Sequence, residues 1–502
     1  MTVKKTISMI ANLNDPTLLK TQAYLNGQWI PANSEATFPV NNPATGERLA
    51  AVANLGPAET RRAIEAAAHA MPAWQALAAK ARSAILKRWY QLIQQHADDL
   101  ATLITLEQGK PLAEAQAEVA NGAAFIEWFA EEGKRVYGDI IPAPNSTQRG
   151  IVIKQPIGVV AAITPWNFPH SMITRKIGPA LAVGCAIVLK PAPETPLSAL
   201  TLAVLAERAE LPPGLFNVVP STDTEAVGHE LTHHPIVKKV TFTGSTQVGK
   251  LLMQQTANTV KRTSMELGGN APLIVFDDAD LDQAVAGAIA SKFRNAGQTC
   301  ICTNRLLIQA GIYDDFVAAF TTAVQQLQLG NGLDPLTTQG PLITEQAVAT
   351  VDAKVQQAIS AGATLIVGGQ PSALGPRYYQ PTVLTVVNSQ MAVFRDEIFG
   401  PVAPIIQFDT EQQAIDMAND TDYGLAAYLY TQSIERHWRV AEHLEYGMVG
   451  VNETAIGSEA IPFGGIKASG QGREGSKYGL DDYLNTKYIC LGGMEHRSPH
   501  LS

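Results

Sequence analysis

The chain contains little cysteine: its 502 residues include only Cys185, Cys300, Cys302 and Cys490. A secreted scaffold held by disulfides carries more cysteine in a shorter chain, so that class is excluded. A zinc clip needs about four ligands, and no third Cys or His lies close to Cys300 and Cys302 in the sequence. The sequence therefore predicts no metal site.

Long apolar runs and basic patches are also missing. No run of about 20 apolar residues free of charge occurs, so no transmembrane helix is expected. The apolar stretch of the opening residues 1–20 is interrupted by Asn12, Asn14 and Asp15, and it lacks the core of a signal peptide. The net charge of −9 is spread along the chain, which argues against nucleic acid and weakly against anionic membranes. We expect a soluble cytoplasmic protein, and an anionic small substrate remains compatible with this charge.

The sequence instead shows the patterns of a large α/β protein. A chain of 502 residues is too long for one hydrophobic core, and its length predicts roughly two to four domains. Residues 57–138 are rich in Ala, Leu, Gln and Glu with helical spacing, which predicts consecutive helices. From about residue 150, short β-branched runs such as CAIVLKP, KKVTFTG and APLIVF alternate with helical segments, and this resumes over residues 340–450. Such alternation is typical of parallel sheets covered by helices, and we predict two such domains that meet near residues 266–270.

Polar or glycine-rich residues follow several predicted strands, where ligands bind in an open parallel sheet. The turn after VTF contains Gly244 and Ser245 at the start of a helix. This turn is suited either to a pyrophosphate or to plain capping of the helix. Lys190 ends another strand, where its side chain is either simply exposed to solvent or contacts a ribose or phosphate group.

The two neighbouring cysteines allow packing or chemistry. Burial as small apolar residues suits Cys185 and Cys490. Cys300 follows Ala-Gly-Gln-Thr, a polar turn after a predicted helix that ends near Phe293. A thiol on such a turn is expected to be accessible, and nearby N–H dipoles are expected to favour its thiolate. From the local residues alone, Cys300 is either a nucleophile or a packing residue.

Several segments together resemble the aldehyde dehydrogenase superfamily. MELGGN (265–270) and FRNAGQTC (293–300) resemble its two signature segments, and further similar segments follow the family's order and spacing. These segments are TPWNFP (164–169), KPAPETP (190–196), FTGST (242–246), EIFGP (397–401) and PFGG (462–465). The resemblance covers residues from about 22 to 490. MITRK, FRNAGQTCIC and PFGGIKASGQGREGSKYG are most similar to the succinate-semialdehyde dehydrogenases of this family, with glutarate-semialdehyde dehydrogenases as close relatives.

The resemblance implies a catalytic set and an activity. Cys300 would be the nucleophile, Asn167 would stabilise the oxyanion together with the Cys300 N–H, and Glu266 would be the general base. The activity implied is oxidation of succinate semialdehyde to succinate through a thiohemiacetal and a thioester on Cys300. The family's C-x-C pair also implies that Cys300 and Cys302 can form an inactivating disulfide. A glutarate-semialdehyde or other aldehyde dehydrogenase is one alternative, and an ester or thioester hydrolase that uses Cys300 and Glu266 is another.

The resemblance also implies a nicotinamide cofactor without a metal. NAD-preferring relatives often carry Glu three residues after the lysine that matches Lys190, and this chain has Pro193 there. Loss of that carboxylate removes a ribose contact and a repulsion of a 2′-phosphate, so NADP is expected over NAD. The neighbouring Glu194 opposes this preference. The residues implied to bind the cofactor are Trp166, Asn167, Lys190, Pro191, Ala192, Pro193, Gly244, Ser245, Leu267 and Glu397.

The substrate site implied by the resemblance is basic. Arg175 and Arg294 match the arginines of succinate-semialdehyde enzymes, and a guanidinium group suits the far carboxylate of a semialdehyde. The alternative is that both arginines pair with other groups of the protein and serve only the structure. Ser458 is expected to add a hydroxyl contact, although its loop ETAIGSEAI departs from the family's usual residues.

The expected architecture is an aldehyde dehydrogenase-like fold with two Rossmann-like parallel-sheet domains and an oligomerisation β-hairpin. We expect a dinucleotide-binding domain of residues 1–139 and 156–268 and a catalytic domain of residues 269–460. Residues 140–155 and 480–502 are expected to form the oligomerisation segment. A homotetramer built as a dimer of dimers, and a role in 4-aminobutyrate degradation, are expected by resemblance.

Overall fold

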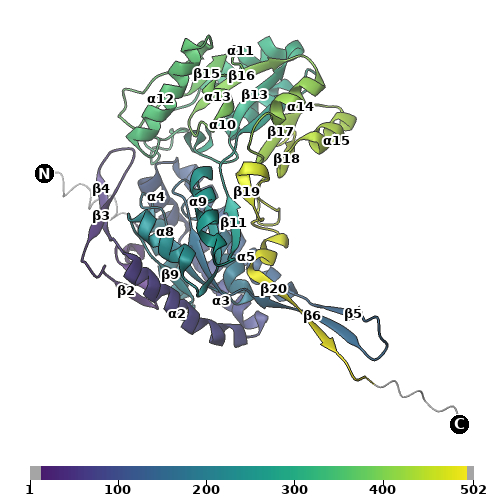
Figure 1. The fold of residues 1–502 in the computed structure, drawn as a ribbon. Helices are drawn as coiled ribbons and strands as arrows, with labels where there is room; N and C mark the ends of the chain where they lie inside the picture. Colours follow the sequence, from purple (N-terminus) through teal and green to yellow (C-terminus); the bar gives the residue numbers. More distant parts are fainter. Residues whose placement is uncertain (1–12, 495–502) are drawn as a thin grey trace.

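The computed structural model describes residues 13–494. Two lobes lie one above the other, each built around its own sheet, and a narrow three-stranded arm projects from the lower lobe (Figure 1). The predicted domain segment 1–139 and the predicted oligomerisation segment 480–502 extend into residues 1–12 and 495–502, which lie outside the described residues. Within residues 13–494, we find no helix whose length and apolar character would let it cross a membrane.

The first lobe contains an eight-stranded sheet in the order β19-β11-β10-β7-β8-β9-β1-β2. The five central strands are parallel, whereas β1, β2 and β19 pair antiparallel at the edges. The predicted parallel sheet is therefore confirmed for the centre only. The strands are β1 (Ala23–Leu25), β2 (Gln28–Ile30), β7 (Val159–Ile163), β8 (Ala186–Lys190), β9 (Phe216–Val218), β10 (Val237–Thr243), β11 (Arg262–Glu266) and β19 (Gly470–Gln471).

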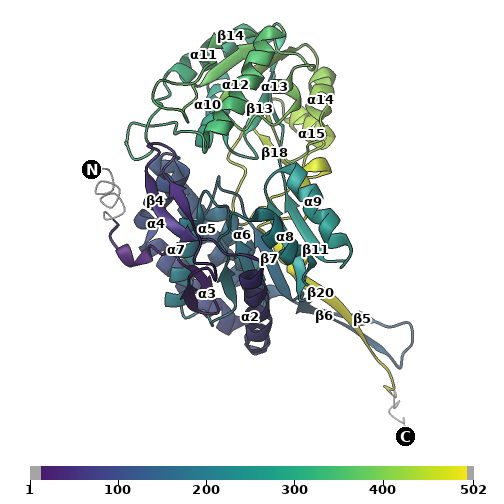
Figure 2. The same ribbon diagram turned by 60° about the vertical axis from the view of Figure 1, so that its left-hand side comes forward.

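Helices cover both faces of this sheet (Figure 2). The prediction of consecutive helices over residues 57–138 is confirmed, because α2 to α5 follow one another there. The helices of this lobe are α2 (Pro57–Ala76), α3 (Ala79–Gln95), α4 (Ala97–Gln108), α5 (Leu112–Glu132), α6 (Ser171–Val183), α7 (Pro196–Arg208), α8 (Thr224–His233) and α9 (Thr246–Ala257). A hairpin that the sequence analysis did not assign precedes them, formed by β3 (Thr37–Asn41) and β4 (Arg48–Ala53).

The second lobe contains a seven-stranded sheet in the order β14-β15-β16-β13-β12-β17-β18. Six of its strands are parallel. β14 is an exposed antiparallel edge strand, so the parallel pattern predicted over residues 340–450 is corrected at this edge. The strands are β12 (Ala271–Val275), β13 (Thr303–Gln309), β14 (Thr364–Val367), β15 (Thr382–Thr385), β16 (Val402–Phe408), β17 (Ala426–Tyr430) and β18 (Met448–Val451).

Apolar clusters pack on the two faces of the second sheet beneath its helices. These helices are α10 (Leu281–Phe293), α11 (Tyr313–Gln325), α12 (Glu345–Ser360), α13 (Ala392–Arg395), α14 (Glu411–Asn419) and α15 (Ile434–His443). Short 3-10 turns complete the chain: η1 (Pro16–Leu18), η2 (Gly133–Arg135), η3 (Arg294–Gly297), η4 (Ala310–Ile312), η5 (Lys467–Ser469) and η6 (Tyr478–Tyr483).

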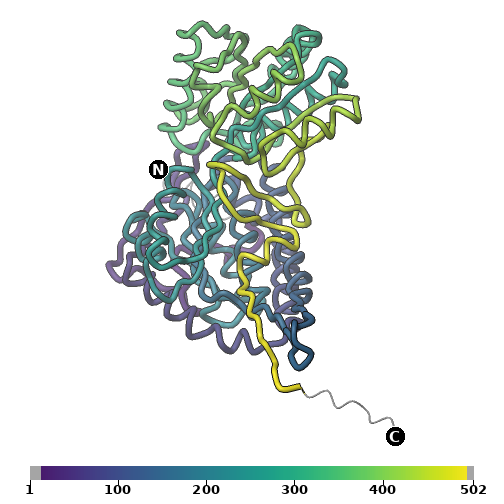
Figure 3. Tube along the Cα trace, turned by 45° about the vertical axis from the view of Figure 1, so that its right-hand side comes forward, coloured from purple at the N-terminus to yellow at the C-terminus, as the bar shows by residue number. Residues whose placement is uncertain are grey.

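The arm joins segments far apart in the sequence (Figure 3). Its strands β5 (Asp139–Pro142), β6 (Arg149–Pro156) and β20 (Leu484–Leu491) pair antiparallel in the order β20-β6-β5. The chain passes from the first sheet to the second between β11 and β12, at residues 267–270. The division of the chain into a dinucleotide-binding domain, a catalytic domain and an oligomerisation segment stays a prediction.

Candidate active site

The strand register of the first sheet brings several predicted site segments to one edge. Ile163 on β7 lies opposite both Lys190 and Phe242, and Thr243 lies opposite Glu266. The residues that follow β7, β8, β10 and β11 therefore emerge together at the carboxyl ends of parallel strands, where ligands bind in such sheets.

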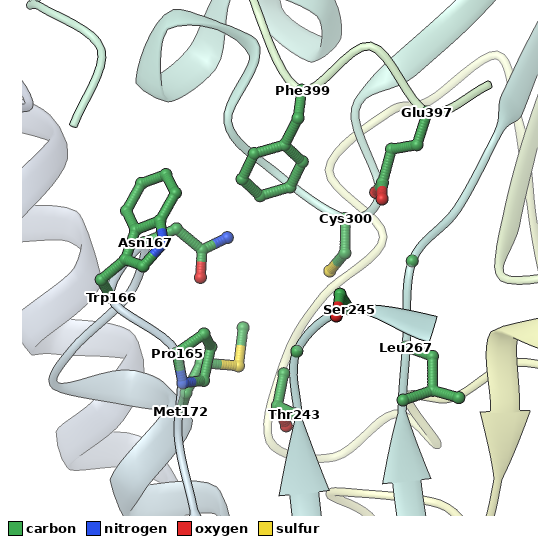
Figure 4. A pocket seen from close by; sticks show the side chains of 12 residues that line it. Pro165, Trp166, Asn167, Met172, Thr243, Ser245, Leu267, Cys300, Glu397 and Phe399 are labelled. Atoms are coloured by element: carbon green, nitrogen blue, oxygen red, sulfur yellow. The ribbon is translucent and has the colours of Figure 1, made fainter. Parts of the chain in front are cut away.

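The second lobe forms the opposite wall of the site with loops that precede its strands, at the amino ends of those strands. Cys300 comes just before β13, and Glu397 comes before β16. The two lobes enclose a cavity of about 270 Å³, and Figure 4 shows the Cys300 side chain pointing into it across from Asn167. The cavity is lined by Pro165, Trp166, Asn167, Met172, Thr243, Gly244, Ser245, Leu267, Gly268, Cys300, Glu397 and Phe399.

The part of this cavity that is predicted to hold the cofactor combines a helix N-terminus with room made by a glycine. The Ser245 hydroxyl accepts a hydrogen bond from Val248 N at 3.4 Å and so caps α9, and the turn also lines the cavity. A Cβ on Gly268 would lie 2.5 Å from a Glu397 carboxylate oxygen. Glu397 accepts a hydrogen bond from Gly269 N at 3.1 Å, and burial raises its pKa to about 7.

The KPAPETP turn lies beside a different cavity. Lys190 is buried at the end of β8 and does not line the cavity around Cys300. Pro193 and Glu194 line a neighbouring cavity of about 340 Å³ together with Thr222. Burial lowers the pKa of Lys190 to about 8, although the charges of Glu194 and Asp223 act in the opposite direction. Pro191 and Ala192, which lie between Lys190 and Pro193 in the chain, are also buried.

The loop before Cys300 has an unusual backbone. Asn295, Ala296 and Gly297 follow one another with φ of 51°, 55° and 75°, in the left-handed region that costs energy for residues other than glycine. The Glu114 carboxylate accepts a hydrogen bond from Asn295 N at 2.8 Å and helps to hold this turn. The turn reverses the chain after α10 and brings Cys300 into the cavity wall.

The expectation of a favoured thiolate at Cys300 is wrong for the structure as it stands. Burial raises the pKa of the Cys300 thiol to about 12; the Glu397 charge acts in the same direction, while that of Arg175 acts against it. The residue is half-buried, so its thiol faces the cavity but lacks the solvation that an open turn would give. The thiol is therefore protonated at neutral pH.

This protonation predicts slow alkylation of the cofactor-free enzyme at neutral pH. Because only the thiolate reacts, the rate with iodoacetamide is expected to rise ~10-fold per pH unit between pH 7 and pH 9, without a plateau below about pH 10. Mass spectrometry of the peptide that contains Cys300 measures this rate separately from those of the other cysteines. A plateau near pH 7 would show that a thiolate is already stabilised there.

Cys302 differs from Cys300 in its surroundings. It is buried, and its Sγ lies 3.3 Å from both the Lys292 and the Thr303 carbonyl oxygens. Both Cys300 and Cys302 are free thiols in the structure. The disulfide between them that the family resemblance implies stays a prediction.

Asn167 and Glu266 approach the cavity in different ways. Asn167 is buried, its Nδ2 donates to Gln298 O at 3.0 Å, and its Oδ1 has no partner in the described protein. Glu266 is buried behind the lining residues, and a Cβ on Gly464 would lie 3.0 Å from its Oε1. Neither Glu266 oxygen has a hydrogen-bond partner in the described protein. Its cap and salt-bridge alternatives therefore find no support there.

Burial raises the pKa of Glu266 well above its usual range, and the nearby Glu474 charge adds to this effect. Lys176 acts against it. Lys176 is itself buried, pairs with Glu474 and donates to Thr243 Oγ1 at 2.7 Å. The carboxyl of Glu266 thus holds its proton more tightly than an exposed carboxyl does, as suits a group that exchanges protons.

A smaller second chamber also borders Cys300, and both predicted arginines line it. It is lined by Glu118, Asn121, Phe168, Ser171, Met172, Arg175, Arg294, Thr299, Cys300, Ile301 and Phe463. Arg175 is buried between the rings of Phe125 and Phe463, with its guanidinium carbon 4.7 and 4.6 Å from their centroids. Arg294 is exposed and lies over Phe168 at 5.2 Å.

The guanidinium group of Arg175 has spare donors. Its Nη2 donates to Asn121 Oδ1 at 3.4 Å, but its Nε and Nη1 are buried without a partner in the described protein. Among residues 13–494, neither Arg175 nor Arg294 forms an ion pair with a carboxylate. The alternative of structural pairing therefore finds no support, and the chamber has the chemistry of an anion site.

Ser458 is not part of this chamber. It is half-exposed, and its hydroxyl accepts a hydrogen bond from Ala460 N at 3.3 Å. This bond uses the hydroxyl only as an acceptor and leaves its O–H free to donate, so the predicted contact of Ser458 with the substrate stays a prediction. Sequence reasoning missed Phe399, whose ring meets Trp166 edge-on at 5.7 Å, and Phe463. Both lie within quoted family segments, EIFGP and PFGG, so the segments gave the signal.

Comparison with known proteins agrees with this geometry. Residues 29–489 match the model of the aldehyde dehydrogenase family. The chain is 57% identical to a 3-sulfolactaldehyde dehydrogenase of Pseudomonas putida over 96% of its length and 99% of that protein. It is 58% identical to a glutarate-semialdehyde dehydrogenase of Pseudomonas aeruginosa over 96% of the chain and 100% of that protein.

Two further proteins extend the comparison. The chain is 57% identical to the succinate-semialdehyde dehydrogenase [NADP(+)] of Escherichia coli over 96% of its length and 99% of that protein. The solved succinate-semialdehyde dehydrogenase of Burkholderia pseudomallei superposes with a TM-score of 0.95 at 56% identity, over 96% of this chain and 100% of that one. Within residues 13–494, no group of three or more His, Cys, Asp or Glu residues has an arrangement suited to a metal ion.

Proposed function

Since the chain belongs to the aldehyde dehydrogenase family, we propose that it oxidises a short aldehyde with an anionic far end, foremost succinate semialdehyde, to the acid with NADP⁺ or NAD⁺. The observation that supports this substrate class is Arg175, a buried guanidinium group with two unpartnered donor atoms in the chamber beside Cys300. A carboxylate or sulfonate would satisfy these donors.

In the proposed reaction, the Cys300 thiol releases its proton to solvent, and the sulfur adds to the aldehyde carbon and forms a thiohemiacetal. Asn167 Nδ2 and the Cys300 N–H donate to the new oxyanion. A nicotinamide held among Trp166, Leu267 and Glu397 would supply the acceptor for the hydride of this carbon. The remaining thioester on Cys300 is hydrolysed by a water whose proton passes to Glu266.

The residues that line the cavity between the two lobes fit a nicotinamide cofactor. Gly244 and Ser245 present the N-terminus of α9, which favours a pyrophosphate, and Gly268 leaves room beside Glu397. Trp166, Leu267 and Glu397 line the proposed nicotinamide end. Lys190 and Pro193 are proposed to face the adenosine ribose, with NADP⁺ preferred over NAD⁺ because Pro193 places no carboxylate there.

The pKa of Lys190 predicts a pH dependence for NADP⁺ binding. A lysine with a pKa of about 8 is protonated at pH 7 and loses its charge above pH 8. The dissociation constant of NADP⁺, measured by quenching of tryptophan fluorescence, is expected to rise ~10-fold between pH 7 and pH 9. That of NAD⁺ is expected to change little. In Lys190→Met the difference between the two cofactors should vanish, and an equal rise for NAD⁺ in the parent would contradict this assignment.

Replacement of Glu266 by glutamine is expected to separate the two half-reactions. Hydride transfer needs no base at Glu266, so a burst of about one equivalent of reduced cofactor per subunit should remain, followed by turnover ~10²–10³-fold slower than that of the parent. Stopped-flow absorbance of reduced nicotinamide measures both phases. Loss of the burst in step with turnover would place Glu266 before hydride transfer instead.

The proposed function is tested by kcat/KM for succinate semialdehyde with NADP⁺ and NAD⁺ in parallel. Glutarate semialdehyde, 3-sulfolactaldehyde and the uncharged pentanal complete the panel, since relatives of nearly equal identity have different names. Equal rates for pentanal and the anionic aldehydes would overturn the anion site. Ester cleavage that needs no nicotinamide, without aldehyde oxidation, would favour the hydrolase alternative.

We also propose that the arm mediates assembly into a homotetramer built as a dimer of dimers. Ile140, Ile141 and Tyr488 on its strands are exposed apolar residues, which are typical of a surface that packs against another chain. Light scattering in solution measures the mass of the assembly. A cytoplasmic location and a role in 4-aminobutyrate degradation stay predictions.

A further inference from the structure

One short turn separates the two chambers of the site. Residues 166–171 follow β7 and lead into α6. Trp166 and Asn167 line the cavity that the two lobes enclose, whereas Phe168 and Ser171 line the smaller chamber with the two arginines. A shift of this turn would therefore move the Asn167 amide relative to Cys300 and change the shape of both chambers.

An ion pair that the proposed reaction does not use lies directly behind this turn. Lys110, between α4 and α5, pairs with Glu118 on α5 at 2.5 Å, and both side chains have an exposed fraction of 0%. Removing two charges from water is costly, and such pairs give little net stability compared with apolar residues of similar size. Stability alone is therefore a weak reason for this pair.

Within residues 13–494, every polar contact that the side chains of Lys110 and Glu118 make outside the pair goes to this turn. Lys110 Nζ donates to Asn167 O at 2.8 Å and lies 3.7 Å from the Phe168 ring centroid. Glu118 Oε1 accepts hydrogen bonds from His170 N at 2.8 Å and Ser171 N at 3.2 Å. The carboxylate also lies at the N-terminus of α6, where a negative charge is favoured.

The Asn167 carbonyl group also connects this turn to the loop that precedes Cys300. Asn295 Nδ2 donates both to Asn167 O at 3.1 Å and to Gln298 O at 3.2 Å. Asn167 O thus accepts one hydrogen bond from Lys110 of the first lobe and one from the loop that precedes Cys300. These contacts fix the backbone of Asn167 relative to Cys300.

We propose that Lys110 and Glu118 are positioning residues, which hold the Asn167 amide where the oxyanion forms on the Cys300 adduct. This inference rests on the proposed function, in which Asn167 donates to that oxyanion. Neither residue of the pair exchanges a proton with the substrate. Their effect passes through the Asn167 backbone and is therefore an effect on kcat more than on KM.

The test compares Lys110→Met, Asn167→Ala and the double variant. Lys110→Met is expected to lower kcat for succinate semialdehyde ~30–100-fold while KM changes less than ~3-fold, since a misplacement of about 1 Å costs this much. If Lys110 acts through Asn167, the double variant should be no more than ~3-fold slower than Asn167→Ala. Multiplication of the two separate losses in the double variant would overturn the proposal.

Two controls separate positioning from loss of folding. Lys239→Met removes another fully buried lysine, which donates to Ser264, and its kcat is expected to stay within ~3-fold of the parent because Lys239 contacts neither the turn nor the cavity lining. Glu118→Gln keeps an acceptor for His170 N and Ser171 N. Its kcat is expected to fall ~3–10-fold, so it tests the pair even if Lys110→Met does not fold.

A second measurement uses reactions of Cys300 that need no cofactor. Alkylation by iodoacetamide forms no oxyanion, whereas hydrolysis of 4-nitrophenyl acetate does. Lys110→Met is expected to lose ester hydrolysis in step with kcat and to keep its alkylation rate within ~3-fold of the parent. An equal loss in both reactions would indicate a general distortion and contradict the inference.

The outcomes also distinguish this inference from the proposed function. A kcat of Lys110→Met equal to that of the parent, with Asn167→Ala strongly impaired, would overturn the positioning role alone. Full activity of Asn167→Ala would overturn the oxyanion role on which both depend.

Discussion

Replacement of Cys300 by alanine is expected to lower kcat for aldehyde oxidation ~10⁴-fold or more, because no other group in the cavity can form the covalent adduct. The cavity wall and the N-terminus of α9 do not depend on the thiol, so NADP⁺ should bind with a dissociation constant within ~3-fold of the parent. Reduced-nicotinamide absorbance measures the rate, and quenching of tryptophan fluorescence measures cofactor binding.

Cys302 provides the matched control two residues away. Its Sγ contacts the Lys292 and Thr303 carbonyls, and the residue does not line either chamber. Cys302→Ala is expected to keep kcat within ~3-fold of the parent, since it deletes only a small buried side chain. If Cys302→Ala lost activity and Cys300→Ala kept it, the assignment of the nucleophile would be wrong.

The second large effect is expected when both arginines are replaced by methionine. A hydrogen bond to a charged group contributes ~1.5–3 kcal/mol, so one bond from each arginine predicts a ~10²–10⁴-fold loss of kcat/KM for succinate semialdehyde in the double variant. Pentanal has no anionic end, so its kcat/KM should change less than ~5-fold. The ratio of the two substrates is therefore the measurement, and it is insensitive to small losses of active enzyme.

The two single variants should differ. Arg175 is buried and offers two unpartnered donors, whereas Arg294 is exposed at the edge of the chamber. Arg175→Met is expected to cause most of the loss at any ionic strength. The effect of Arg294→Met should shrink as salt rises from 0.05 to 0.5 M, because exposed charges are screened over ~10 Å or less. Equal losses for pentanal and succinate semialdehyde would show that the arginines support the fold and not the anion.

Local sequence predicted the elements well where the chemistry of the pattern is local. The consecutive helices α2 to α5, the central strands β7, β8 and β10, and the helix start at Ser245 follow from apolar spacing and capping, which involve neighbouring residues. The edge strands were harder. β14 resembles a parallel strand in composition, but its antiparallel pairing with β15 depends on a partner about 20 residues away.

Several site properties depend on residues that are distant in the sequence. The pKa of Cys300 was misjudged because burial and the charge of Glu397, 97 positions later, outweigh the local turn. Lys110 gave no signal at all, since its role near Asn167 arises only when α5 packs against α6.

The sequence by itself determined which groups are candidates for the chemistry: a cysteine, a carboxylate, an amide and two arginines, because these reside in segments whose residue types and order are specific. Only the tertiary structure decided how they meet. The first sheet contributes the carboxyl ends of its strands, and the second sheet contributes loops that precede its strands, so Cys300 and Glu397 face Asn167 across the cavity. Local propensities act over a few residues and specify each strand. The placement of one lobe against the other depends on contacts between residues more than 100 positions apart, such as Asn167 and Gln298.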